Sequence, residues 1–218
     1  MILSDYRAAI FDLDGTLVLS EPAWEEAKRR VLARLGIAVP QAVYDAFVGR
    51  GLRGFLNEVL GPDLPDARRT DLANQIGAEA DILLPQLRQA VPGAAAFVNR
   101  VAEAGLAVAV CSSSPSRHIV AALDQLGLSA LIPTRVSGAD LPRGKPDPLP
   151  YLETLRRLGL SPDKAFAVED ALPGVRSAHA AGLAVIGIGA QAQTQDFAPL
   201  CRFRVRDYRG LNSHFGLP

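Results

Sequence analysis

The sequence is poor in the residues that mark secreted, membrane and small metal-binding proteins. Its 218 residues include only two cysteines, Cys111 and Cys201, and no CxxC pair, so neither a disulfide framework nor a cysteine-rich zinc site is indicated. We expect both cysteines to pack as small hydrophobic residues in a reducing compartment. No apolar run approaches the roughly 18 residues of a membrane span, and the acidic N-terminal stretch is unlike a signal peptide. The expected location is cytoplasmic, without a membrane partner.

An excess of charge of either sign is also missing. Lys plus Arg and Asp plus Glu both number 23, which gives a formal net charge of zero. Nucleic-acid-binding proteins usually carry a basic excess, so we expect no nucleic-acid partner. Hydrophobic residues make up 49% of the chain, enough to bury a sizeable core. The length suits one α/β domain with a modest insertion.

Short apolar runs separated by helical patterns predict a parallel α/β fold. Nearly continuous apolar runs are typical of parallel strands that are covered on both faces, and helix-spaced apolar residues lie between them. This alternation predicts a three-layer, Rossmann-like core. The expected strands cover residues 8–11, 106–111, 165–168 and 183–188, with weaker ones near 134–136 and 202–205, and the expected helices cover 116–126, 148–158 and 172–181.

One interval has helical spacing but no convincing strand. Between about residues 20 and 88, apolar residues such as Trp24, Val31 and Leu35 recur at helical intervals. We therefore expect a small helical cap domain at 20–89, inserted into a core formed by 1–19 and 90–218. Trp24 is expected to pack within this domain rather than to contact substrate.

Polar clusters follow the predicted strands. Because the carboxyl ends of parallel strands share one edge of a sheet, these clusters are expected to meet there. Each cluster alone could be a turn, a helix cap or a surface lysine, but those interpretations do not explain why all fall on one side. Converging carboxylates repel unless a cation lies between them, and their hard oxygens suit Mg²⁺. The residues are Asp12 and Asp14 after 8–11, Ser112 after 106–111, Lys145 in a loop after 134–136, and Glu169 with Asp170 after 165–168.

The same clusters resemble the four motifs of the haloacid dehalogenase superfamily. DLDGTLV at 12–18 is similar to the first motif, and Ser112, Lys145 in GKPDP and residues 169–170 in VEDALPGV follow in order. The position of the insertion resembles the helical-cap subgroup, which includes phosphoglycolate phosphatases, sugar-phosphate phosphatases and β-phosphoglucomutase. The resemblance implies a Mg²⁺-dependent phosphatase that acts on a small phosphorylated metabolite.

The resemblance also implies roles for single residues. Asp12 would be the nucleophile that forms an aspartyl-phosphate, and Asp14 the general acid and base. Ser112 and Lys145 would contact the phosphoryl group as further catalytic residues. The implied metal ligands are Asp12, the backbone carbonyl of Asp14, Glu169 and Asp170. The implied substrate-binding residues are Ser113, Ser114 and Ser116, chiefly through backbone NH groups at a helix start, and Arg50.

Alternatives within the superfamily differ in chemistry. A dehalogenase typically lacks the second aspartate, and a phosphonate-cleaving relative needs a cap lysine in a context that Lys28 does not match. Mutases commonly show a DT or DS pair and then a histidine, where this chain has Leu19-Ser20 and Trp24. We therefore favour a phosphatase, with a phosphosugar mutase as the alternative and a non-catalytic phosphometabolite-binding protein as the second. The expected assembly is a monomer or weak homodimer.

The three histidines do not have metal-ligand spacing. We expect His118 on a helix surface and His179 on an inward helical face.

Overall fold

The computed structural model describes residues 2–47 and 52–217. The chain divides into two compact units, one formed by residues 1–19 with 90–218 and the other by residues 20–89. Arg50 lies outside the described residues, so its expected role in substrate binding remains a prediction.

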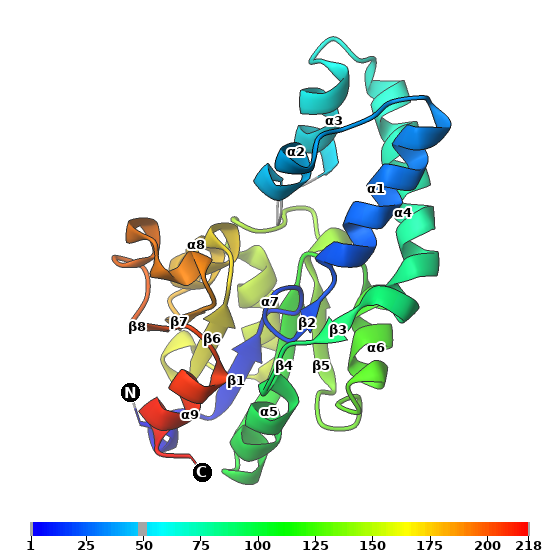
Figure 1. The fold of residues 1–218 in the computed structure, drawn as a ribbon. Coiled ribbons are helices and arrows are strands. Elements are labelled where there is room, and N and C mark those ends of the chain that lie inside the picture. Colours follow the sequence, from blue (N-terminus) through cyan, green and yellow to red (C-terminus); the bar gives the residue numbers. More distant parts are fainter. Residues whose placement is uncertain (1, 48–51, 218) are drawn as a thin grey trace. The chain divides into compact units, whose positions relative to one another are not determined.

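The larger unit is built on a six-stranded sheet with the order β5-β4-β1-β6-β7-β8, in which all neighbouring strands are parallel (Figure 1). Strand β1 lies in the middle, where Phe11 pairs with Val110 on one side and Val168 on the other. Every residue of β1 is fully buried, which explains its continuous apolar run. The strands are β1 Ala8–Phe11, β4 Ala107–Ser112, β5 Thr134–Ser137, β6 Ala165–Glu169, β7 Ala184–Ile188 and β8 Phe203–Val205.

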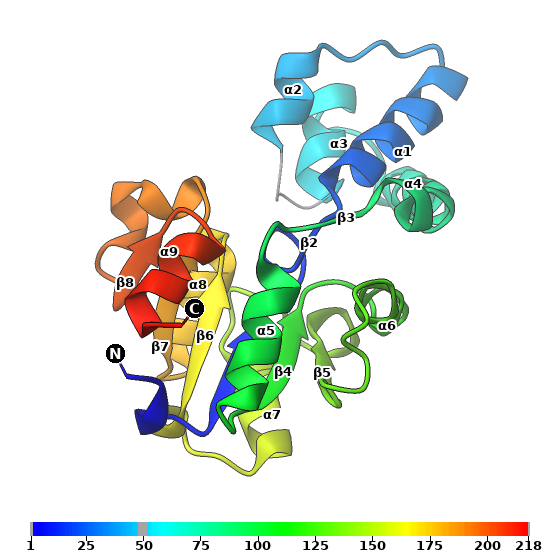
Figure 2. The same cartoon turned by 60° about the horizontal axis from the view of Figure 1, so that its bottom comes forward.

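Helices cover both faces of this sheet and complete the predicted three layers. Figure 2 looks onto the face where α5 (Ala94–Glu103) and α9 (Tyr208–Phe215) pack; α6 (Ser116–Gln125) contributes to the same core. The opposite face is covered by α7 (Leu149–Leu158) and α8 (Leu172–Ala180). Short 3-10 helices occupy Leu3–Asp5, Gly138–Asp140, Pro162–Lys164, Gln191–Gln193 and Gln195–Phe197.

The smaller unit contains the helices α1 (Glu21–Arg34), α2 (Gln41–Ala46), α3 (Leu52–Leu60) and α4 (Asp66–Leu87). Their apolar faces enclose a core of their own, which includes Val31, Phe55 and Ile76. Trp24 is partly buried and packs against this core. Lys28 is also buried; it pairs with Glu21 at 3.2 Å, and its ammonium lies 5.2 Å from the centre of the Phe55 ring.

Two short strands, β2 (Val18–Leu19) and β3 (Gln89–Ala90), form a separate two-stranded sheet. These strands are not predicted from the sequence, because two residues are too few to show a strand pattern.

The histidine predictions were wrong in both cases. His118 is only 7% exposed and belongs to the buried face of α6, whereas His179 is exposed near the end of α8. Helical spacing alone does not define where the buried face ends. None of the helices in 2–47 and 52–217 has both the length and the apolar character to cross a membrane.

Candidate active site

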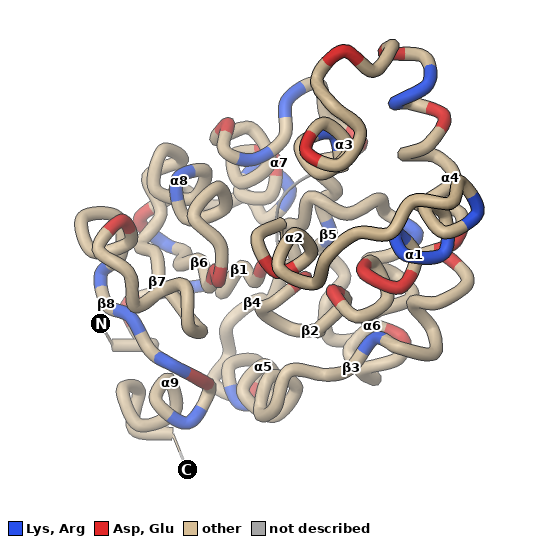
Figure 3. Tube along the Cα trace, turned by 45° about the horizontal axis from the view of Figure 1, so that its top comes forward, with Lys and Arg blue, Asp and Glu red and all other residues tan. Residues whose placement is uncertain are grey.

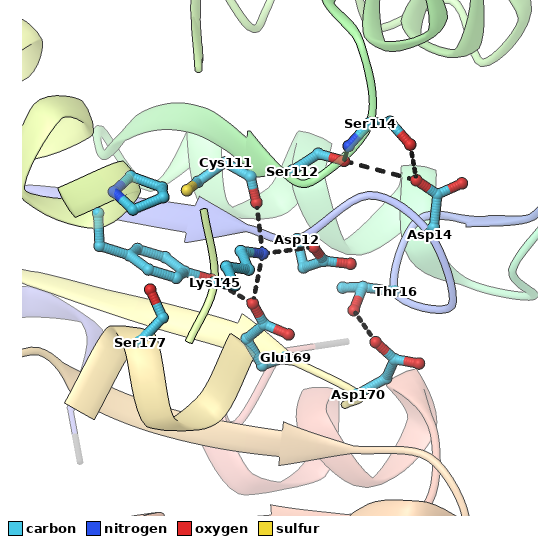
Figure 4. Close-up of polar contacts among 12 residues, drawn as sticks. Asp12, Asp14, Thr16, Cys111, Ser112, Ser114, Lys145, Glu169, Asp170 and Ser177 are labelled. Carbon is cyan, nitrogen blue, oxygen red and sulfur yellow. Dashed lines mark hydrogen bonds and ion pairs between the residues drawn. The ribbon is translucent and has the colours of Figure 1, made fainter. Parts of the chain in front are cut away.

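The predicted polar clusters meet at the carboxyl-terminal edge of the larger unit's sheet (Figure 4). Asp12 directly follows β1, and its amide donates a 3.0 Å hydrogen bond to the Val168 carbonyl of β6. Ser112 is the last residue of β4, and Glu169 is the last residue of β6. The parallel register of β1, β4 and β6 therefore brings together residues that are up to 157 positions apart (169 − 12).

Lys145 lies at the centre of this cluster. Its ammonium is 2.6 Å from Asp12 Oδ1, 2.6 Å from Glu169 Oε1 and 2.8 Å from the Cys111 carbonyl oxygen (Figure 4). The Lys145 side chain is only 4% exposed. Burial alone lowers the pKa of such an ammonium, but the carboxylates of Asp12 and Glu169 outweigh it and raise the pKa of Lys145. Lys145 is therefore a fixed positive charge beside Asp12.

Three carboxylates form an oxygen cluster that fits a divalent cation. Asp12, Glu169 and Asp170 each offer one oxygen atom, and these atoms lie within 4.8 Å of one another. Burial, followed by the charge of Glu169, raises the pKa of Asp170 to about 7. Burial also raises the pKa of Asp12; the charges of Glu169 and Asp170 add to this effect, and Lys145 opposes it. Asp12 and Glu169 are buried and Asp170 is half-buried. One ammonium does not balance three carboxylates in such surroundings, and an all-oxygen donor set suits Mg²⁺.

Gly15 permits the close approach of Asp170. Its φ is +89°, and a Cβ at this position would lie 2.0 Å from Asp170 Oδ2. The Thr16 hydroxyl is 3.5 Å from Asp170 Oδ1 (Figure 4). The sequence predicts a sharp turn at Gly15, but the contact with a carboxylate 155 positions later (170 − 15) depends on the fold.

Gly174 has the corresponding role beside Glu169. It lies in the first turn of α8, and a Cβ there would be 2.1 Å from both carboxylate oxygens of Glu169. Glu169 therefore rests against the start of a helix, where backbone NH groups favour negative charge. This role of Gly174 is not predicted from the sequence, although the residue is part of VEDALPGV.

Asp14 points toward the loop after β4. Its Oδ2 accepts a 2.6 Å hydrogen bond from the Ser114 hydroxyl and lies 3.5 Å from the Ser112 hydroxyl, which itself accepts a 3.0 Å bond from the Ser114 amide (Figure 4). The Asp14 carboxylate is not one of the three groups in the oxygen cluster.

The remaining predicted serines are placed differently. The Ser116 hydroxyl donates a 2.5 Å hydrogen bond to Asp140 and is thereby directed to the 3-10 helix Gly138–Asp140. Ser113 is exposed in the segment between β4 and α6. The structure therefore brings Ser112 and Ser114, but not the Ser116 hydroxyl, into contact with the predicted catalytic residues.

Two buried tyrosines complete the surroundings of the cluster, and neither is predicted from the sequence. The Tyr151 hydroxyl, on α7, donates a 2.6 Å hydrogen bond to Glu169 Oε1. The Tyr208 hydroxyl, on α9, donates a 2.9 Å hydrogen bond to the Thr16 carbonyl. Helical patterning could have indicated that both are buried, but not which polar group each one meets.

The parallel α/β sheet carries a buried lysine and an acidic cluster at the end of its first strand. This combination is typical of a class of hydrolases that act through an aspartate. The chain belongs to the haloacid dehalogenase-like hydrolase family, whose model matches residues 6–182.

Several known proteins are similar to this chain over most of its length. It is 34% identical to a phosphoglycolate phosphatase of Rhodospirillum rubrum, over 97% of this chain and 92% of that protein. It is 31% identical to hexitol phosphatase B of Escherichia coli K12, over 87% and 86% respectively. Among solved structures, a "putative beta-phosphoglucomutase" from Thermotoga maritima is 26% identical with a TM-score of 0.79, covering 97% of this chain and all of that one.

Proposed function

We propose that the protein is a Mg²⁺-dependent phosphatase that hydrolyses a phosphoric monoester of a small metabolite through an aspartyl-phosphate. The observation that carries this proposal is the placement of Asp12, which lies 2.6 Å from the Lys145 ammonium and offers an oxygen within 4.8 Å of oxygens of Glu169 and Asp170. A carboxylate in these surroundings is positioned to attack a phosphorus atom whose negative charge is balanced. The phosphatase names of the curated relatives support the same activity.

Asp12 and Asp14 divide the covalent chemistry between them. The Asp12 carboxylate attacks phosphorus, the bond from phosphorus to the ester oxygen breaks, and Asp14 donates a proton to the departing alcohol. Asp14 then takes a proton from a water molecule, whose oxygen attacks phosphorus and releases phosphate from Asp12. The Ser114 hydroxyl orients the Asp14 carboxylate for both steps.

The oxygen cluster would hold the metal. Asp12 and Asp170 are the direct carboxylate ligands in this proposal, with the Asp14 backbone carbonyl as a further ligand. Glu169 Oε1 accepts hydrogen bonds from Lys145 and Tyr151. Its second oxygen, Oε2, is therefore the atom that would bind the metal. Mg²⁺, when bound, supplies positive charge to the phosphoryl oxygens.

The substrate is a sugar phosphate or a similar small phosphomonoester. Lys145, the Ser112 hydroxyl and backbone NH groups of residues 113–116 bind the phosphoryl oxygens. The helical unit at 20–89 acts as the cap that selects the alcohol portion of the substrate. Arg50 is the candidate contact from this cap. The "putative beta-phosphoglucomutase" similarity keeps a phosphosugar mutase as a second candidate. We further propose a cytoplasmic monomer or weak homodimer that binds neither nucleic acid nor membrane.

A phosphate-release screen over phosphorylated metabolites tests this function. Phosphoglycolate, hexitol phosphates and β-glucose 1-phosphate are incubated with the wild-type protein and with Asp12→Asn, in Mg²⁺ and after chelation. We expect Mg²⁺-dependent phosphate release that falls at least roughly 10⁴-fold in Asp12→Asn, as for other covalent nucleophiles. Unchanged turnover in that variant would refute the nucleophile, full activity after chelation would refute the metal, and conversion of β-glucose 1-phosphate to glucose 6-phosphate without free phosphate would establish the mutase.

A further inference from the structure

Tyr208 links the C-terminal helix to the loop that follows Asp12. It is the first residue of α9 and is 1% exposed. Its hydroxyl donates a 2.9 Å hydrogen bond to the carbonyl of Thr16, which is 192 positions earlier in the chain. The proposed reaction uses neither this hydroxyl nor α9, so the contact requires its own explanation.

The Thr16 carbonyl accepts its hydrogen bond from the Tyr208 side chain, whereas neighbouring carbonyls of the loop accept theirs from backbone amides. The Gly15 amide donates to the Val18 carbonyl at 2.7 Å, and the Val18 amide donates to the Leu13 carbonyl at 3.0 Å. The Leu17 carbonyl accepts a 3.0 Å bond from the Val91 amide. Thr16 is fully buried, so deletion of the phenol hydroxyl would take the hydrogen-bond donor away from a carbonyl shielded from solvent.

The loop held in this way touches Asp170 at two points. The Thr16 hydroxyl lies 3.5 Å from Asp170 Oδ1 (Figure 4). Gly15 lies so close that a Cβ would be 2.0 Å from Asp170 Oδ2. Because these contacts leave little free space, a displacement of residues 15–16 would also move Asp170 relative to Asp12.

We propose that Tyr208 is a positioning residue for the metal site, which it supports by holding the Thr16 carbonyl and thereby the loop against Asp170. This inference rests on the proposed function. Burial, followed by the charges of Asp12 and Asp170, raises the pKa of Tyr208, so the phenol remains a hydrogen-bond donor. Groups that orient metal ligands typically change metal affinity or activity by about 10–100-fold when they are altered.

A purely structural role for Tyr208 is the competing explanation. Its ring packs against Phe97 at 5.5 Å between centroids, and its Cβ lies beside Gly93. Two variants separate the roles. Tyr208→Phe keeps the ring and removes only the hydroxyl, whereas Leu211→Ala removes a fully buried side chain from the same helix.

Two measurements are made on each full-length variant: Mg²⁺ binding by calorimetry without substrate, and amide hydrogen exchange of residues 13–18 without metal. Tyr208→Phe is expected to weaken Mg²⁺ binding by about tenfold and to accelerate exchange in 13–18. Leu211→Ala is expected to lower the melting temperature while leaving both quantities near wild-type values.

Wild-type exchange rates in Tyr208→Phe, or equal acceleration of the loop in Leu211→Ala, would overturn the positioning role. An unchanged Mg²⁺ affinity in Tyr208→Phe would overturn its link to the metal site. If the wild-type protein itself did not bind Mg²⁺, the proposed metal site and the metal part of this inference would both fail. The exchange measurement would still decide whether Tyr208 holds the loop.

Discussion

The surface ion pairs of the helical unit and the ion pairs at the end of β1 lie in opposite environments. In the helical unit, Arg29 pairs with Glu25 on the surface of α1, and Arg53 pairs with Asp66 at 3.1 Å with side chains that are 73% and 77% exposed. Figure 3 shows positive and negative segments close together along α1 and α4. In the larger unit, by contrast, Lys145 and Glu169 are only 4% and 1% exposed and meet Asp12 at the end of β1.

This difference distinguishes exposed ion pairs, which contribute little to stability, from the buried charges at the end of β1, which we assign to the reaction. Exposed ion pairs contribute roughly 0–1 kcal/mol, because water competes for both partners. Buried pairs have a large desolvation cost, and apolar replacements are often as stable or more stable. A buried lysine between carboxylates is therefore weak evidence for stability and better evidence for a reaction centre.

Replacement of Lys145 is the strongest test of this comparison. Lys145→Met leaves Asp12 and Glu169 in the interior without their ammonium partner, and removal of one partner from a buried pair costs about 3–5 kcal/mol. Phosphatase activity should fall by roughly 10²–10³-fold, since a fixed positive charge beside the phosphoryl group is lost. Chemical denaturation and kcat measure the two effects.

Arg53→Met in the helical unit is the matched control. It breaks an ion pair that is exposed on both sides, so the free energy of unfolding should remain within experimental error. The proposed contrast between the units would be broken if both variants lost the same stability.

Gly15 and Gly36 provide a second matched pair. Both have positive φ, but a Cβ on Gly15 meets Asp170, whereas a Cβ on Gly36 meets no atom within 4 Å. Gly15→Ala should weaken Mg²⁺ binding by about 10–100-fold because it displaces a ligand. Gly36→Ala should cost about 1 kcal/mol of backbone strain without changing Mg²⁺ binding. Calorimetric titration of both variants checks this, and equal Mg²⁺ affinities would show that Gly15 serves only the turn.

The sequence predicted the parts of the molecule that follow from local patterns and strand order. The apolar runs at 8–11 and 165–168 correspond to β1 and β6, and the residues that follow them, Asp12 and Asp170, come within reach of one cation. The acidic cluster could be predicted because parallel strands bring their carboxyl ends to one edge whatever their separation in sequence.

The contacts around the cluster could not be predicted in the same way. The contacts of Tyr208 with Thr16 and of Gly174 with Glu169 depend on how helices α9 and α8 pack, which one sequence does not define. The partners of the serine hydroxyls could not be predicted for the same reason: Ser114 donates to Asp14, whereas Ser116, two residues later, donates to Asp140. His118 and His179 were misplaced because helical spacing gives a period but not the orientation of the buried face.

The smallest expected effect concerns Glu79, the most enclosed carboxylate among the described surface ion pairs of the helical unit. Its side chain is 10% exposed and accepts hydrogen bonds from Arg34 and from Arg30, the latter at 3.1 Å. The hydrogen bonds from Arg34 and Arg30 lower the pKa of Glu79 from 4.5. A carboxylate with a lowered pKa in the folded state stabilises the protein above its unfolded pKa, and this contribution disappears as the pH falls through the folded value.

Glu79→Gln should therefore reduce the melting temperature by less than about 4 °C at pH 7, and the difference from wild type should close below about pH 4. Phosphatase activity at 25 °C should not change, because Glu79 forms its ion pairs entirely within the helical unit. Thermal melts of both proteins from pH 7 to pH 3 provide the measurement. A difference that stayed constant over this range would mean that the ionised carboxylate contributes nothing, and that Glu79 acts through packing alone.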